Sequence, residues 1–186
     1  MIQFYKPNKS VTGNACSFWL NRDGSIMSSM IKQDSWNQER RVGSFSKNKG
    51  NPQKSVITKL SRIEVGGIID AIETNREFSA YHRSQKQILQ IRFCPYIRDD
   101  KQIGFSFSIN KQDVEDSTNK VSFVIGFYFP ESRLLKHDLE TFLDKTIKIQ
   151  HYIPEESNEL APKSPVKEHN LDSPPSSDPF EDSEIF

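Results

Sequence analysis

Apolar and polar residues alternate in short runs along most of the first 145 residues, with turn residues between the runs. A period of two is typical of strands that bury one face. The pattern predicts eight strands, at 15–20, 25–31, 40–48, 55–60, 77–84, 87–96, 103–110 and 120–129. The run at 103–110 is the most regular, because Ile and Phe alternate there with Gly, Ser and Asn.

Each group of four predicted strands is followed by a helical pattern. Residues 61–75 begin with Ser61 and Glu64 at the spacing of a capping box, and their isoleucines recur at helical spacing. Residues 130–146 begin at Pro130, and their apolar face is formed by Leu135, Leu139, Phe142 and Leu143. The chain therefore predicts an α+β fold of two ββββα repeats. A sheet that is covered by helices on one side keeps its other face open.

Composition changes near residue 150. Residues 1–150 contain 23 basic and 16 acidic residues, whereas residues 151–186 contain nine acidic and two basic residues and six of the ten prolines. The second composition cannot bury enough apolar surface to fold alone. We therefore predict a domain at 1–150 and a disordered acidic tail at 151–186, and the net positive charge of the domain favours an anionic partner.

Catalytic signatures are absent from the sequence. Its four histidines are scattered without metal-ligand spacing, and it contains neither a Gly-rich phosphate loop nor a nucleophile elbow. Acidic pairs such as Asp99-Asp100 fall in predicted turns. We therefore predict that the protein is not an enzyme and has no metal and no cofactor.

The location of the protein is predicted from what the chain lacks and from its two cysteines. It contains no apolar run long enough to cross a membrane and no apolar signal core near its first residue. Cys16 and Cys94 lie in strand-like runs and are expected to be free thiols in a reducing compartment. These features predict a cytoplasmic protein with no membrane partner.

Aromatic and basic residues occur together in both halves. A single-stranded nucleic acid exposes base faces and phosphates, so a protein that binds it needs aromatic platforms beside Lys and Arg. A single aromatic residue can equally belong to the core, so the prediction depends on the joint presence of the two types. The candidates are Trp19, Lys32, Trp36, Arg40, Arg41, Phe45, Lys47, Lys49 and Lys54 in the first half, and Tyr81, Arg83, Lys86, Arg92 and Tyr96 in the second.

The order of the predicted elements resembles that of a known superfamily. The segments that carry the resemblance are "SVITKLSRIEVGGIIDAI", "EFSAYHRSQKQILQIRFCPY", "IGFSFSIN" and "SFVIGFYFPESRLLKHDLETFL". Over residues 15–145 the chain is similar to the Whirly / PC4-like single-stranded DNA-binding superfamily, although it lacks the basic "KGKAAL"-type segment of the plant proteins. The resemblance implies sequence-independent binding of single-stranded DNA and assembly into a dimer or tetramer. We expect subunits to pack through the apolar face of 132–143, with Gly66 and Gly67 allowing close helix approach.

The last ten residues, "SDPFEDSEIF", have a resemblance of their own. They are similar to the acidic terminal peptides with which bacterial and phage single-stranded DNA-binding proteins recruit replication or recombination proteins. This resemblance implies a bacterial or phage protein, in the cytoplasm of a bacterium or of a phage-infected cell. The residues expected to contact such a partner are Asp178, Phe180, Glu181, Asp182, Glu184, Ile185 and Phe186.

Together, these patterns favour a single-stranded DNA-binding protein that acts in DNA replication, recombination or repair. One alternative is an RNA-binding or transcription-regulating protein of the same fold. A second is a protein-interaction scaffold with an acidic adaptor tail, and a third is a nuclease. Salt-sensitive binding to DNA and RNA oligomers, and metal-dependent loss of the oligomer, distinguish them.

Overall fold

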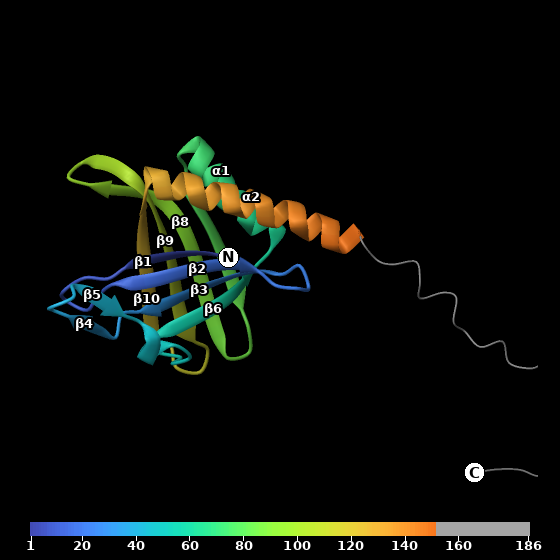
Figure 1. Cartoon of the computed structure of the whole chain (residues 1–186). Helices are drawn as coiled ribbons and strands as arrows, with labels where there is room; N and C mark the ends of the chain where they lie inside the picture. The colour runs from blue at the N-terminus through green and yellow to red at the C-terminus, as the bar shows by residue number, and fades with distance from the viewer. Residues whose placement is uncertain (152–186) are drawn as a thin grey trace, which may run out of the picture. The chain divides into compact units, whose positions relative to one another are not determined.

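Two four-stranded antiparallel sheets cross one another, and two helices lie side by side at one end of the pair (Figure 1). The computed structural model describes residues 1–151. Sheet 1 has the strand order β1-β2-β3-β6 and sheet 2 the order β10-β9-β8-β7. The strands are β1 (Ile2–Lys6), β2 (Asn14–Leu20), β3 (Ile26–Lys32), β6 (Ser55–Leu60), β7 (Phe78–Arg83), β8 (Gln87–Arg98), β9 (Lys101–Asp113) and β10 (Lys120–Tyr128). Helix α1 (Arg62–Thr74) follows sheet 1 and α2 (Phe129–His151) follows sheet 2, so the predicted two ββββα repeats are confirmed.

The first repeat differs from the prediction in two strands. Its first strand is β1, which the prediction missed, because only Ile2 and Phe4 mark the buried face of so short a run. The predicted strand at 40–48 is wrong. This segment contributes β5 (Val42–Ser44) to a small hairpin with β4 (Ser35–Asn37) and then forms the 3-10 helix η1 (Ser46–Asn48). Its residues bury no apolar face against the core, so nothing draws them into sheet 1.

Phenylalanines from both sheets meet in the core. The Phe4 and Phe127 rings are 4.7 Å apart, and those of Phe18 and Phe107 are 5.3 Å apart, so each pair joins one sheet to the other. Helix α2 packs against this core through Leu135, Leu139 and Phe142, which are all buried. The half-buried strand that alternation predicted at 103–110 is confirmed in β9, where Phe105, Phe107 and Ile109 are buried.

Burial of α2 overturns the expected subunit interface. The apolar face of 132–143 packs within its own chain, so it is not free to contact a second copy. Gly67 also allows a close contact within its own chain, because a Cβ atom at this position would lie 2.3 Å from the ring of Phe78. A Cβ atom at Gly66 would meet no atom within 4 Å. Subunit packing through this face was a wrong prediction, and any assembly would use other surfaces.

The predicted capping box begins α1 and also links the two sheets. The Ser61 amide donates to one oxygen of Glu64 at 2.7 Å, and Nε2 of His82 lies 2.5 Å from the other oxygen. Nδ1 of His82 lies 3.1 Å from Oγ1 of Thr58 on β6. Burial raises the pKa of Glu64, but the hydrogen bonds from Ser61 and His82 outweigh it and leave this pKa below its usual value. His82 thus holds β7 against β6 and α1.

Both cysteines are free thiols, as predicted. Cys16 is fully buried, and burial raises the pKa of its thiol. Cys94 is half-buried, with Sγ 3.3 Å from Oγ of Ser106.

Neither of the helices found within residues 1–151 is apolar enough over a sufficient length to span a bilayer.

Candidate nucleic-acid interface

The outer face of sheet 1, on the side away from sheet 2, carries a groove of about 700 Å³. Its floor is built from strands β1, β2, β3 and β6, and one wall comes from the segment that contains β5 and η1. The residues that line it are Met1, Gln3, Tyr5, Ala15, Ser17, Trp19, Ser29, Ile31, Gly43, Ser44, Phe45, Ser46, Lys49, Gly50, Ser55, Val56 and Ile57.

The floor is hollow because small residues meet across the strands. Ser17 on β2 lies opposite Ser29 on β3, and Ala15 lies opposite Ile31, which in turn faces Ser55 on β6. Directly opposed residues share a face, so these residues form two adjacent rows in which Ile31 and Ile57 are the larger side chains. The rows supply hydroxyl groups and leave depth for a flat ring.

Aromatic side chains stand around this floor. Tyr5 and Phe45 come from distant parts of the chain, and their ring centroids are 5.8 Å apart. Trp19 projects from β2, where its indole N–H donates to Oδ1 of Asn21 at 2.8 Å and thereby fixes the ring. Rings arranged in this way around polar hydroxyls suit a ligand with flat faces and polar edges.

The wall formed by β5 and η1 is held by buried and charged groups at its base. Gln33 is buried, its Oε1 accepts from the Asn8 amide at 2.9 Å, and its Nε2 donates to the carbonyls of Asn8 and Ser35. Asp34 accepts hydrogen bonds from Ser35 and Ser44 hydroxyls and from the Lys47 amide, which hold its pKa below the usual value. These contacts keep Phe45 beside the floor.

The charge around the groove is positive. Lys49 lines it, and none of the described lining residues is acidic. Lys59 lies on the same outer face, since it is opposite Met27 on β3, and Met27 is opposite Trp19. Cations next to aromatic rings are the combination that attracts a negatively charged strand.

The structure brings three of the predicted site residues together at this groove: Trp19, Phe45 and Lys49. Lys47 lies in η1, Lys54 lies in the loop before β6, and Arg40 and Arg41 lie in the exposed turn between β4 and β5. Trp36 on β4 is half-buried outside the groove, with its indole N–H enclosed and unpartnered within the described residues. Lys32 projects to the opposite, inner face of sheet 1, since Met30, two residues earlier, is in the core.

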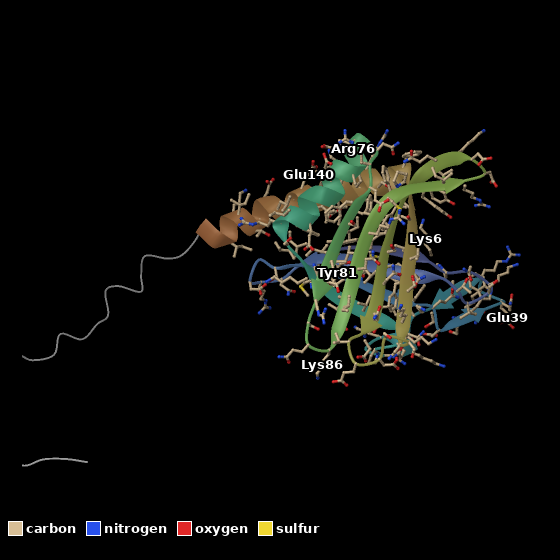
Figure 2. All side chains as sticks on the ribbon, turned by 180° about the vertical axis from the view of Figure 1, so that it is seen from behind. Lys6, Glu39, Arg76, Tyr81, Lys86 and Glu140 are labelled. Carbon is tan, nitrogen blue, oxygen red and sulfur yellow. The ribbon has the colours of Figure 1, made fainter. Side chains whose placement is uncertain are left out.

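The remaining predicted residues lie on or next to the outer face of sheet 2. Figure 2 shows Tyr81 on this face and Lys86 in the loop at the end away from the helices. Tyr81 is 60% exposed, Arg83 follows it on β7, and the Tyr96 ring covers Gly126. Arg92 is already engaged, because its guanidinium donates to both oxygens of Glu77 at 2.6 and 2.5 Å. On sheet 2, therefore, one of the predicted cations is already paired with a carboxylate.

Sequence reasoning missed several groove residues. Tyr5 was overlooked together with β1, although the alternation of Ile2 and Phe4 with Gln3 and Tyr5 carries the signal. Ser17, Ser29 and Ser55 have no distinguishing sequence pattern. The predicted tail residues from Asp178 to Phe186 lie outside the described residues.

Among residues 1–151, no three His, Cys, Asp or Glu side chains gather closely enough to hold a metal ion.

Comparison with known proteins identifies the fold. No protein-family model and no curated protein match the sequence. In three dimensions the chain is similar to the Whirly protein WHY1 from Arabidopsis thaliana, with a TM-score of 0.56 and 13% identity over 81% of this chain and 86% of WHY1. It is also similar to the plant transcriptional regulator PBF-2, with a TM-score of 0.54 and 15% identity over 86% of this chain and 90% of that one. The chain thus has the Whirly fold, as its sequence pattern predicted.

Proposed function

We propose that this Whirly-fold protein binds single-stranded nucleic acid in the groove on sheet 1, and that DNA is its principal ligand. Bases stack on Trp19, Tyr5 and Phe45, while Lys49 and the neighbouring lysines neutralise phosphates. The protein acts without catalysis, in DNA replication, recombination or repair, in the cytoplasm of a bacterium or of a phage-infected cell.

The observation that supports this proposal most strongly is the combination found in one groove. Three aromatic residues surround a floor of small hydroxyl-bearing residues, and the lining contains a cation and no carboxylate. Stacking requires unpaired bases, because in a duplex the base faces are covered by neighbouring pairs. Serine hydroxyls both donate and accept hydrogen bonds, so they can pair with the polar edge of any of the four bases. The groove therefore favours single strands without a sequence preference.

Titration of a fluorescent oligo-dT at several salt concentrations tests this function. Affinity should fall linearly on a log–log plot, with a slope of about −0.7 for each neutralised phosphate. A duplex of the same length serves as the control and should bind more weakly. Affinity that is independent of salt, or equal for duplex and single strand, would contradict the proposal. Light scattering on the same samples measures the expected self-association into a dimer or tetramer.

A second candidate function is RNA binding or regulation of transcription. The likeness to a plant transcriptional regulator favours it, since that protein has the same fold. The groove contacts proposed above involve bases and phosphates, which RNA also offers. Preference for an oligo-U over the matched oligo-dU, which differ only in the 2′-hydroxyl, would favour this candidate.

The acidic tail at 151–186 is proposed to recruit replication or recombination proteins. Residues 177–186 combine four carboxylate side chains with the apolar side chains of Phe180, Ile185 and Phe186, which suit a basic pocket with an apolar floor. Deleting residues 171–186 should leave the melting temperature unchanged and oligo-dT affinity equal or higher, because negative charge is removed. Pull-down of partners from the host should be lost. Partners that are still pulled down after the deletion would contradict this role, and weaker DNA binding would show that the tail does not compete with DNA.

A further inference from the structure

A row of polar residues crosses the inner face of sheet 1 at the edge of the core. Lys6 lies opposite Asn14, and Asn14 lies opposite Lys32. The Lys32 amide then donates to the carbonyl of Lys54 at 2.9 Å, which continues the row across the sheet. Opposed residues project to the same face. That face is the inner one, since the residues two positions away in β1, β2, β3 and β6 are buried: Phe4, Cys16, Met30 and Val56.

The lysines of this row differ in how their charge is balanced. Lys6 forms an ion pair with Glu131 and lies 4.9 Å from the centre of the Tyr128 ring. Within residues 1–151, neither Lys32 nor Lys54 has a carboxylate within 4.0 Å.

Lys32 is held in an unfavourable position for a free cation. Its amine is half-buried, 5.3 Å from the centre of the Phe123 ring. Burial, and to a lesser extent repulsion from Lys54, lowers the pKa of Lys32. Two neighbouring cations without a counter-charge reduce stability, and a bound anion would offset this cost.

The loop that carries Lys54 lies between two hollows that contain lysines. On one side, Lys49, Gly50 and Ser55 line the groove on sheet 1. On the other side, Pro52 and Gln53 line a cleft of about 210 Å³ together with Lys86, Lys111 and the carboxylate of Asp113. The Lys111 amine donates to the Pro52 carbonyl at 3.0 Å, so sheet 2 holds this loop in place. Lys54 therefore lies in the segment between the groove and this cleft.

We propose that Lys32 and Lys54 jointly bind one backbone phosphate of the strand whose bases occupy the groove. This inference rests on the proposed function and adds the course of the strand, which turns over the end of β3 and β6 toward the inner face. Two ammonium groups offer six N–H donors to the two non-bridging oxygens of a phosphate diester, and the negative charge of the phosphate reduces the repulsion between them.

Salt-dependent titration of oligo-dT distinguishes one shared phosphate from two separate ones. The variants are Lys32→Gln, Lys54→Gln and the double substitution, with Lys145→Gln on the exposed surface of α2 as the matched control. In the double variant the log–log slope should become less negative by about 0.7, which is the value for one phosphate. In each single variant the slope should change by no more than this amount. The control should keep the wild-type slope. A double variant with an unchanged slope, or one that loses about 1.4, would overturn the inference.

The melting temperature of a Lys32 variant distinguishes a ligand-binding role of Lys32 from a structural one. Lys32→Met removes the half-buried amine and keeps the length of the side chain, so the free protein should melt at a higher temperature while binding oligo-dT more weakly. A lower melting temperature would assign Lys32 a structural role and overturn the inference. If the wild-type protein does not bind oligo-dT, the proposed function is wrong. If the wild-type protein binds and the slope of the double variant is unchanged, only the inference about Lys32 and Lys54 is wrong.

Discussion

Replacing Trp19 and Phe45 together by alanine is expected to weaken oligo-dT binding by roughly 30-fold to 10⁴-fold. Each stacked ring contributes about 1–3 kcal/mol to binding, and about 1.4 kcal/mol corresponds to a tenfold change. Both rings line the groove from different segments, Trp19 from β2 and Phe45 from the residue after β5. Fluorescence anisotropy at low salt measures the loss, and thermal unfolding of the variant verifies that the fold is retained.

Matched aromatic substitutions elsewhere show whether the groove is the site. Phe129→Ala removes a ring at the start of α2, outside the groove, and should leave affinity unchanged. Tyr81→Ala with Tyr96→Ala removes two rings from the outer face of sheet 2 and should weaken binding less than the groove pair does. An equal or larger loss from the sheet 2 pair would move the site to that sheet.

The tryptophans allow a direct test of the same contact. The chain contains two, Trp19 and Trp36, and only Trp19 lines the groove. In a Trp36→Phe variant the emission comes from Trp19 alone, and stacking of a base on that ring should quench it. Emission that is unchanged at saturating oligo-dT would remove Trp19 from the interface.

Replacing Phe107 by alanine is expected to lower the free energy of unfolding by about 3–5 kcal/mol, as for other fully buried phenylalanines. Phe107 has no exposed surface, and its ring contacts Phe18 of the other sheet and Phe93 of its own. The loss would combine the transfer of its apolar surface with a cavity at the junction of the two sheets. Urea denaturation measures it, through a shift of the midpoint with little change in slope.

Val124→Ala provides the control for this loss. Val124 is an apolar strand residue of sheet 2 that is 50% exposed, so its truncation should change the free energy of unfolding by about 0.5 kcal/mol or less. If Phe107→Ala cost as little as Val124→Ala, the two sheets would not depend on this contact for their packing.

The fold was largely predictable because the buried side of each strand or helix appears as a periodic pattern of apolar residues in the sequence. Ile103, Phe105, Phe107 and Ile109 alternate with small or polar residues, and three of the four are buried on one face of β9. The capping box at Ser61 and Glu64 marked the start of α1 correctly. In both cases the signal lies within a few neighbouring residues.

The predicted site residues fall on separate surfaces of the folded chain. Trp19, Phe45 and Lys49 gather at the groove, whereas Tyr81, Arg83 and Arg92 lie on or beside another sheet. Arg92 illustrates the reason. Its strand position predicted an exposed cation, but whether that cation is free depends on Glu77, which approaches it across the sheet in the folded chain.

Local periodicity was therefore enough to define the elements, their buried sides and the ββββα order of this protein. Local periodicity did not indicate which face of which sheet would carry the groove. The proposed binding face depends on Tyr5 meeting Phe45 and on small residues from three strands, β2, β3 and β6, forming one hollow floor. The proposed phosphate site depends on Lys32 lying beside Lys54 at the inner edge of sheet 1. These contacts join residues that are far apart along the chain, and folding brings them together through packing against a common core. Such contacts cannot be predicted from a short stretch of sequence, because each segment by itself could pack against many others.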